Sequence, residues 1–319
     1  MGDKVAPGRR GGRGRQQGNR QGKRMEIAIH LGVHLTDEDR LIRCLMRNRA
    51  ALLRHGIAVP GTGRYRGPLR RIAHAMRDQP TDAETQEALL DGIISEDEVS
   101  RVVLSSDCFM ANHRWAVSKG QFYPAGAEKA AGLRRLFPAA KVEFFLALRN
   151  PASLLPALIA DPRSGGAEQV LADTDPLTPR WSALLAAMTE AVPGARITVW
   201  RHEDAPLLWP EILRELADHP DDLVLNGTFE ALGAHLTDEG LALMSQWLAE
   251  RPAMTDAQRR RVLRAFLEKF ARPEATAEPA PLPGLNPDQA AELHEVMSAL
   301  YDQDIDLIAQ LPGIDFLEP

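Results

Sequence analysis

Two histidines and a run of carboxylates near the start of the chain are the side chains best suited to chemistry. His30 and His34 lie on either side of a glycine-containing turn, and residues 37–39 (Asp-Glu-Asp) follow. Imidazole is the usual general base near neutral pH, and carboxylates bind divalent cations or amines. In a competing structural interpretation, Thr36 caps a helix and the three acids complement its dipole. His30 ends a buried strand and fits a hydrogen-bonded structural residue, so His34 is the better candidate for a site.

The segment around these residues has the order strand, turn and helix. Residues 26–30 are apolar enough for a short buried strand, residues 31–35 form the turn, and a helix is expected over 36–54. Phosphate groups bind at the N-terminus of such a helix, where free N–H groups and the helix dipole attract anions. A phosphate-binding turn carries small residues, a lysine and hydroxyls. Three carboxylates at this end oppose that ligand.

Further cationic residues are candidates for ligand contacts. Arg149 follows an apolar strand and precedes a helix, where open α/β sheets gather ligand contacts, although a structural ion pair is an equal alternative. Arg64 and Arg66 belong to a basic stretch that is either a solvated helix face or the anchor for an anionic acceptor or partner. His113 follows the end of another strand and is a candidate for the acceptor side. Ser106 lacks the Gly-x-Ser-x-Gly surroundings of a nucleophile elbow.

Short apolar segments alternate with helical segments up to about residue 200. Strands are expected at residues 26–30, 101–104, 142–148 and 196–200, each nearly all apolar, as in a parallel sheet buried on both faces. Helices are expected over residues 36–54, 81–94, 125–137, 151–159 and 179–191. This alternation predicts an α/β fold: a three-layer, doubly wound, mostly parallel sheet with helices on both faces.

From about residue 205 the pattern becomes helical, which predicts a helical C-terminal extension of the same domain. Helices are expected over residues 205–217, 237–249, 256–270 and 286–310, with a Pro-rich linker at 272–284. The apolar spacing of the last helix predicts that it packs back on the core. Residues 161–180 form a loop that is long enough to cover a site. We therefore expect residues 25–319 to form one domain.

Residues 1–24 differ from the rest of the chain in charge and composition. They carry eight Lys or Arg against one acid, a charge of +7, so residues 25–319 carry −13 if the whole chain carries −6. The tail is rich in Gly, Gln and Arg without apolar periodicity, and we expect it to be disordered. One interpretation is an arm that attracts nucleic acid or another polyanion. The alternatives are a solvated extension and an upstream stretch wrongly included ahead of a true start at Met25. The acidic body is a poor nucleic-acid binder.

The overall composition is that of a globular protein. Of 319 residues, 44% are hydrophobic and 26% charged, and no stretch approaches the roughly 20 apolar residues needed to span a bilayer. Cys44 and Cys108 are far apart and lack CxxC spacing, which argues against a zinc site or a disulfide framework and fits a reducing compartment. The basic N-terminus lacks the apolar core of a signal peptide. We therefore expect a cytoplasmic protein without a bound metal.

Several short motifs occur in an order shared with a known family. They are His30-Leu31-Gly32-x-His34, Leu45-x-x-Asn48-Arg49, Gly56-Ile57-x-x-Pro60, Leu104-Ser105-Ser106-Asp107-x-Phe109, Tyr123-Pro124, Leu136-Phe137-Pro138, Leu148-Arg149-Asn150-Pro151, Trp200-Arg201-His202-Glu203-Asp204 and Leu311-Pro312-Gly313-Ile314. In this order the chain, over roughly residues 25–319, resembles the bacterial sulfotransferase-like family, P-loop-fold proteins that use 3′-phosphoadenylyl sulfate (PAPS). The resemblance implies donor contacts from Gly32, Thr36 and Arg149, with His34 in a catalytic role.

The donor-binding motifs depart from the family pattern at two places. The family's phosphosulfate loop is Lys-Thr-Gly-Thr-Thr after the second histidine, whereas residues 35–39 here are Leu-Thr-Asp-Glu-Asp, which keeps only Thr36. The family pairs its arginine, here Arg149, with a serine eight residues later, where this chain has Ala157. A charge-assisted contact to phosphate contributes about 1.5–3 kcal/mol, so we expect PAPS binding to be weak or absent.

Three functional hypotheses follow from these features. The first is a sulfotransferase-like enzyme with a degenerate PAPS site, which transfers a sulfuryl group to a hydroxyl or amine of a small-molecule or saccharide acceptor. The second is a non-catalytic descendant of that fold, which binds a protein partner or a polysaccharide. The third is a nucleic-acid-associated protein that acts through residues 1–24. Donor binding separates the first two, and salt-sensitive RNA binding would support the third.

Overall fold

The computed structural model describes residues 24–76, 79–251, 254–273 and 280–319. Residues 1–23 of the expected tail and 274–279 of the expected linker lie outside the described residues. No helix within the described ranges is both long and apolar enough to cross a membrane.

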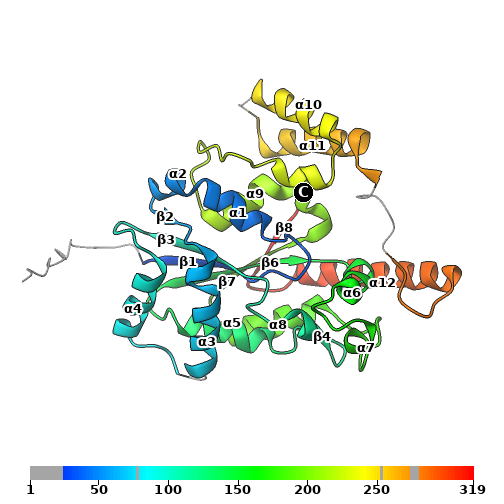
Figure 1. Cartoon of the computed structure of the whole chain (residues 1–319), viewed down its shortest axis with the longest axis horizontal. Coiled ribbons are helices and arrows are strands. Elements are labelled where there is room, and N and C mark those ends of the chain that lie inside the picture. Colours follow the sequence, from blue (N-terminus) through cyan, green and yellow to red (C-terminus); the bar gives the residue numbers. More distant parts are fainter. Residues whose placement is uncertain (1–23, 77–78, 252–253, 274–279) are drawn as a thin grey trace, which may run out of the picture.

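Six strands form the central sheet (Figure 1). Their order across the sheet is β2-β3-β1-β6-β7-β8, and every neighbouring pair is parallel. The strands are β1 Glu26–His30, β2 Ile57–Ala58, β3 Arg101–Ser105, β6 Lys141–Leu148, β7 Arg196–Arg201 and β8 Ile314–Leu317, with a separate hairpin of β4 Val117–Ser118 and β5 Gln121–Phe122. The four expected strands are all present, and β2 and β8 add a short strand at each edge. The α/β fold with a parallel sheet is confirmed.

Helices cover both faces of the sheet and make three layers (Figure 1). Successive strand residues point to opposite sides, so β1 places Ala28 in one apolar cluster and Ile27 in the other. The cluster around Ala28 is covered by α1 Arg40–Arg47, α2 Arg49–Leu53 and α9 Ala205–Ala217. The cluster around Ile27 is covered by α3 Arg66–Met76, α4 Ala83–Ile93, α5 Gly126–Arg135, α6 Pro151–Ala160, α8 Trp181–Ala191 and α12 Pro287–Ile308.

A helical pair packs outside these layers, at the top of Figure 1. It consists of α10 (Asp238–Ala249) and α11 (Asp256–Phe270), and each helix begins after a threonine whose hydroxyl accepts a backbone N–H. The pair has a small apolar cluster of its own, formed by Leu232, Leu236, Met244 and Leu263.

The chain after about residue 205 is more than a helical extension. The helix α9 belongs to one helical layer and α12 to the other, and β8 pairs with β7 at the sheet edge. The Tyr301 hydroxyl hydrogen-bonds the Leu148 carbonyl at 3.0 Å, and Asp304 accepts the Trp181 N–H at 2.7 Å. The last helix is therefore docked on the core, as its apolar spacing predicted.

Ion pairs close the amino end of the sheet. Arg101, at the start of β3, lies 2.8 Å from Glu26 on β1 and 2.8 Å from Glu143 on β6, and Arg101 and Glu143 are buried. Buried charges are tolerated when they are paired in this way. This end of the sheet is structural, which leaves the opposite, carboxyl end for a site.

Candidate functional site

The strand order reverses between β1 and β6, so the switch point, where open α/β sheets form a crevice for ligands, lies at the carboxyl ends of these two strands. β3 and β2 lie beyond β1, whereas β7 and β8 lie beyond β6. The helix after β1 packs on one face of the sheet and the helix after β6 on the other. Ligands of open α/β sheets bind at such a switch point. The turn after β1 and Arg149 after β6 meet here, because Arg149 Nη1 donates to the Leu35 carbonyl at 2.6 Å.

The turn after β1 is packed closely against the loop after β3. Gly32 has a φ of 87°, and a Cβ at this position would lie 2.6 Å from Asp107 Cα. Both features require glycine, so Gly32 has a packing role that is independent of any ligand. Leu35, Glu38 and Asp39 also have positive φ angles, of 61°, 48° and 64°. This backbone conformation is uncommon for residues other than glycine and makes the turn irregular.

The first helix begins at Arg40 rather than at Thr36. The Thr36 hydroxyl donates to the Val33 carbonyl at 2.6 Å, so the expected threonine cap was wrong. The N-cap residue is Asp39, whose side chain makes no cap bond, but Asp37 two residues earlier is buried and its Oδ2 accepts the Leu41 N–H at 3.2 Å. A carboxylate of the chain therefore lies at the helix N-terminus, where an anionic ligand would bind.

Arg66 neutralises a second carboxylate of the turn. Its Nη1 and Nη2 donate to the two carboxylate oxygens of Asp39 at 3.0 and 2.6 Å, and its Nε donates to the Ser105 carbonyl at 2.8 Å. The hydrogen bonds from Arg66 lower the pKa of Asp39. Arg64 is engaged elsewhere, since its Nη1 donates to the Ser95 hydroxyl at 2.7 Å. Of the two arginines predicted as anion contacts, only Arg66 reaches the turn after β1.

Arg149 lies at the crevice but is held by acceptors of the chain itself. Besides the Leu35 carbonyl, it uses its Nε to bond the Ser153 hydroxyl on α6 at 3.0 Å. Burial lowers the pKa of Arg149, although a guanidinium stays charged. These bonds are structural, but their acceptors are a hydroxyl and a carbonyl rather than the carboxylate of the expected ion pair. The position of Arg149 at the switch point also fits a ligand contact.

His34 is buried beside a second histidine. Its Nδ1 hydrogen-bonds the Tyr123 hydroxyl at 2.8 Å, and the centroid of its ring lies 3.9 Å from that of His113. Cys108 Sγ lies 4.0 Å from His34 Nε2. His113 Nε2 lies 3.6 Å from an oxygen of Asp107, and it has no hydrogen-bond partner in the described part of the chain. The loops after β1 and β3 thus bring two imidazoles, a thiol and a carboxylate together.

Burial sets the protonation of this group. Burial and the neighbouring His113 lower the pKa of His34 to about 4, and burial also lowers the pKa of His113. Burial and the Asp107 carboxylate raise the pKa of Cys108 to about 11. At neutral pH both imidazoles are therefore neutral and the thiol is protonated. The group offers lone pairs to a ligand, but no ready nucleophile.

A cavity of about 200 Å³ lies at the turn after β1. It is lined by Val33, Leu35, Asp37, Glu38, Asp39, Asp107 and Arg163, of which four are acidic. Arg163 is paired with Asp161 at 2.8 Å. Both residues belong to the loop 161–180, so this loop covers part of the site.

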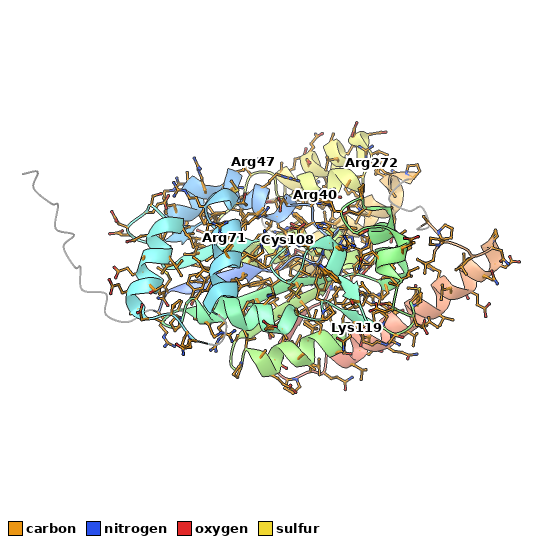
Figure 2. All side chains as sticks on the ribbon, turned by 60° about the horizontal axis from the view of Figure 1, so that its bottom comes forward. Arg40, Arg47, Arg71, Cys108, Lys119 and Arg272 are labelled. Atoms are coloured by element: carbon orange, nitrogen blue, oxygen red, sulfur yellow. The ribbon has the colours of Figure 1, made fainter. Side chains whose placement is uncertain are left out.

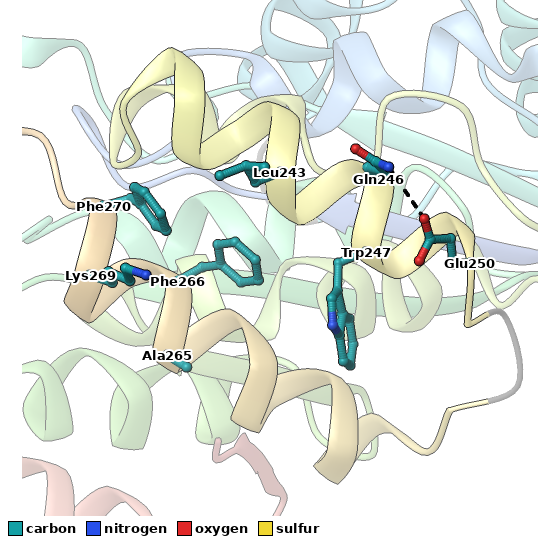
Figure 3. Close-up of a pocket in the computed structure, with 8 residues that line it drawn as sticks. All are labelled: Leu243, Gln246, Trp247, Glu250, Ala265, Phe266, Lys269 and Phe270. Carbon is teal, nitrogen blue, oxygen red and sulfur yellow. Dashed lines mark hydrogen bonds between the residues drawn. The ribbon is translucent and has the colours of Figure 1, made fainter.

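A larger apolar groove of about 410 Å³ lies between α10 and α11 (Figure 3). Its lining consists of Leu243, Gln246, Trp247, Glu250, Ala265, Phe266, Lys269 and Phe270. Gln246 Nε2 donates to Glu250 at 3.3 Å. Besides these two polar side chains, the lining carries one ammonium group, and the rest of it is aliphatic or aromatic.

The sequence singled out His34 and His113 separately and missed the residues that join them. Asp107 and Tyr123 were named only as parts of short family-like motifs and Cys108 in none, and Cys108 is 74 positions from His34. Asp107 and Cys108 follow a strand that is the parallel neighbour of β1, and the sequence pattern does not give this pairing order. The ends of such strands meet at one edge of the sheet.

Comparisons with known proteins leave the family open. No model of a known protein family matches the sequence, and no curated protein matches it. The resemblance to sulfotransferase-like proteins therefore stands on the motifs in the sequence.

Proposed function

We propose that the protein is a non-catalytic binding protein on a sulfotransferase-like fold, which does not hold PAPS in the manner of that family. The observation that carries this proposal is the hydrogen bond from the Leu41 N–H to the Asp37 carboxylate at 3.2 Å. The anion site of the helix N-terminus is already filled by the chain. A phosphate would have to displace a buried carboxylate that belongs to the turn itself.

The other residues fit a phosphosulfate poorly. Leu35 gives no cation to the sulfuryl group, and Ala157 gives no hydroxyl. Arg149 is in place, but two of its nitrogen atoms already donate to the protein. Each missing charge-assisted contact removes about 1.5–3 kcal/mol, so two missing contacts correspond to roughly 10²–10⁴-fold in affinity.

The cavity favours a neutral or cationic ligand. Four carboxylates and one guanidinium line it. Glu38 and Asp39 are paired with arginines, at 2.9 and 2.6 Å, whereas Asp107 keeps a side-chain exposure of 34%. An amine, on a small molecule or on a lysine of a protein partner, matches this lining by charge.

Sulfuryl transfer is the competing function, and one observation favours it. Arg149 and the turn after β1 meet at the switch point, where a donor would bind. An active enzyme would rely on Arg149, His34 and the backbone N–H groups of residues 32–36, because the family's lysine is replaced. His34 has no exposed surface, so it would reach an acceptor only after the surrounding loops moved.

Calorimetric titration with 3′-phosphoadenosine 5′-phosphate tests the proposal. The wild-type protein should give no saturable heat. A variant with the family's residues restored should regain two contacts of about 1.5–3 kcal/mol each and bind roughly 10²–10⁴-fold more tightly, and adding Arg149→Ala should abolish the gain. The restoring substitutions are Leu35→Lys, Asp37→Gly, Glu38→Thr, Asp39→Thr and Ala157→Ser. Saturable binding by the wild type would contradict the proposal, whereas negligible binding by the restored variant would show that the crevice is closed.

A further inference from the structure

A group of potential metal ligands lies beside the crevice, and it shares only Asp107 with the lining of the cavity in the proposed function. It consists of His34, Asp107, Cys108 and His113, and one ligand atom from each lies within 4.8 Å of the others. Figure 2 labels Cys108 near the middle of the molecule. The residues come from the loops after β1 and β3, so the sheet topology positions them.

We propose that these four side chains bind one Zn²⁺, or a similar borderline divalent cation, in a tetrahedral site. Two imidazoles, a thiolate and a carboxylate form a donor set that suits zinc. With metal–ligand bonds of about 2.0–2.3 Å, the ligand atoms of a tetrahedral site lie roughly 3.3–3.7 Å apart. His113 Nε2 lies 3.6 Å from Asp107 Oδ2, and Cys108 Sγ lies 4.0 Å from His34 Nε2. Small side-chain movements therefore bring the four atoms to bonding positions.

The unpartnered nitrogen of His113 points independently to a ligand. His113 is only 6% exposed, and its Nε2 has no hydrogen-bond partner among the described residues. A buried ring nitrogen without a partner is unfavourable. Asp161 lies 3.7 Å from this nitrogen, but Arg163 already engages the same Asp161 oxygen at 2.8 Å. A cation among the four ligands would give the nitrogen its missing partner.

The surroundings also hold His34 in a ligating orientation. The Tyr123 hydroxyl hydrogen-bonds both His34 Nδ1, at 2.8 Å, and the His34 backbone N–H, at 3.0 Å. These bonds fix the ring with Nε2 toward Cys108, as partners of metal-bound histidines commonly do. Metal binding selects the tautomer in which Nδ1 keeps the proton. Cys108 binds as a thiolate and its proton passes to water, so the two negative ligands balance the divalent cation.

The proposed site differs from the expectation, drawn from the spacing of the cysteines, that the chain binds no zinc. Cys108 lacks a CxxC partner, which argued against zinc. Neighbouring parallel strands bring it to His34 instead. The site is independent of donor binding, because it uses none of the residues 35–39.

Metal analysis of the untagged full-length protein tests the site. After loading with Zn²⁺ and removal of the excess, the protein should retain one ion per chain. Loading with Co²⁺ should give the visible bands of a tetrahedral site and a thiolate-to-cobalt charge-transfer band. Retention well below one ion per chain, or a cobalt spectrum without the thiolate band, would overturn the proposal.

Variants identify the ligands. Cys108→Ser should abolish the thiolate band, and Cys108→Ser and His113→Gln should each weaken metal binding at least about tenfold. Cys44→Ser is the matched control, because Cys44 packs in the apolar cluster on the opposite face of the sheet and should leave both signals unchanged. If these two variants do not fold, Asp107→Asn at its part-exposed position should still weaken binding. Wild-type metal affinity in Cys108→Ser or Asp107→Asn would refute the assignment.

Discussion

Replacing Asp37 with alanine should weaken the fold and open the helix N-terminus to anions. The substitution removes the acceptor of the Leu41 N–H, which lies 3.2 Å from Asp37 Oδ2 in a buried position. Loss of a side-chain cap costs about 0.5–2 kcal/mol, and loss of a negative charge near the helix N-terminus costs about 0.3–1 kcal/mol. We expect a decrease of about 1–2 kcal/mol in the free energy of unfolding, or about 2–5 °C in Tm.

The response to phosphate separates this explanation from a general loss of packing. In the Asp37→Ala variant the Leu41 N–H is free, so phosphate should raise the Tm more than chloride at equal ionic strength. The wild type should show no such difference. Glu38→Ala is the matched control: its side chain is 64% exposed and pairs with Arg40, so it should change stability by less than about 1 kcal/mol.

Two results would refute the reasoning about Asp37. One is a variant as stable as the wild type, which would mean that the carboxylate does not cap the helix. The other is an equal response to phosphate in both proteins, which would mean that the helix N-terminus is inaccessible to anions even without the carboxylate. Thermal melts in matched buffers measure both.

Three further predictions concern the tail, the last helix and pH. Removing residues 1–24 should leave the Tm within a few degrees of the full-length value, because the tail has almost no apolar surface. A large decrease in Tm would show that the tail docks on the acidic body. Salt-sensitive RNA binding that is lost with the tail would support a nucleic-acid role. Asp304→Ala should lower the free energy of unfolding by about 2–4 kcal/mol, because the buried carboxylate accepts two backbone N–H groups at the start of α8. The control Asp302→Ala removes an exposed ion pair and should have little effect. Equal urea midpoints for the Asp304→Ala variant and the wild type would contradict this prediction. Burial lowers the pKa of His202 to about 3, so between pH 3 and 6.5 the unfolded chain binds a proton at this residue that the folded chain does not. The free energy of unfolding should therefore fall as pH falls, by up to about 1.4 kcal/mol per pH unit from this group. In urea unfolding, His202→Gln should show a shallower fall than the wild type between pH 6.5 and 5. An unchanged slope would exclude His202 as a contributor.

The sheet could be predicted from the sequence because its central strands are buried on both faces. β1, β3, β6 and β7 are nearly continuous apolar runs, and each was located to within about a residue. β2 has two residues and β8 is only partly buried, so neither carries the same pattern. Both strands join the sheet edge through backbone hydrogen bonds, and side-chain patterns are a weak indicator of such pairing.

The turn after β1 shows what sequence patterns cannot supply. Thr36 and the acids after it are typical of a helix start, which predicted a helix from Thr36. Glu38 and Asp39 instead adopt positive φ angles, and the helix begins at Arg40. Asp39 is held by Arg66, which lies 27 positions away, so tertiary contacts decide this local conformation.

The candidate site was predictable only in part. The meeting of Arg149 with the turn after β1 follows from the rule that parallel strands gather ligand contacts at their carboxyl ends. The approach of Cys108 to His34 needs the side-by-side order of β3 and β1, which strand patterns alone do not fix. Pairing order was therefore the missing information.

A structure of crystals grown with excess 3′-phosphoadenosine 5′-phosphate tests the central claim most directly, because it shows which group accepts the hydrogen bond from the Leu41 N–H. We predict that the Asp37 carboxylate stays on this N–H and that no nucleotide lies between the carboxyl ends of β1 and β6. A phosphate bound to the Leu41 N–H, with Asp37 turned away and Arg149 on the nucleotide, would contradict the proposal and favour sulfuryl transfer.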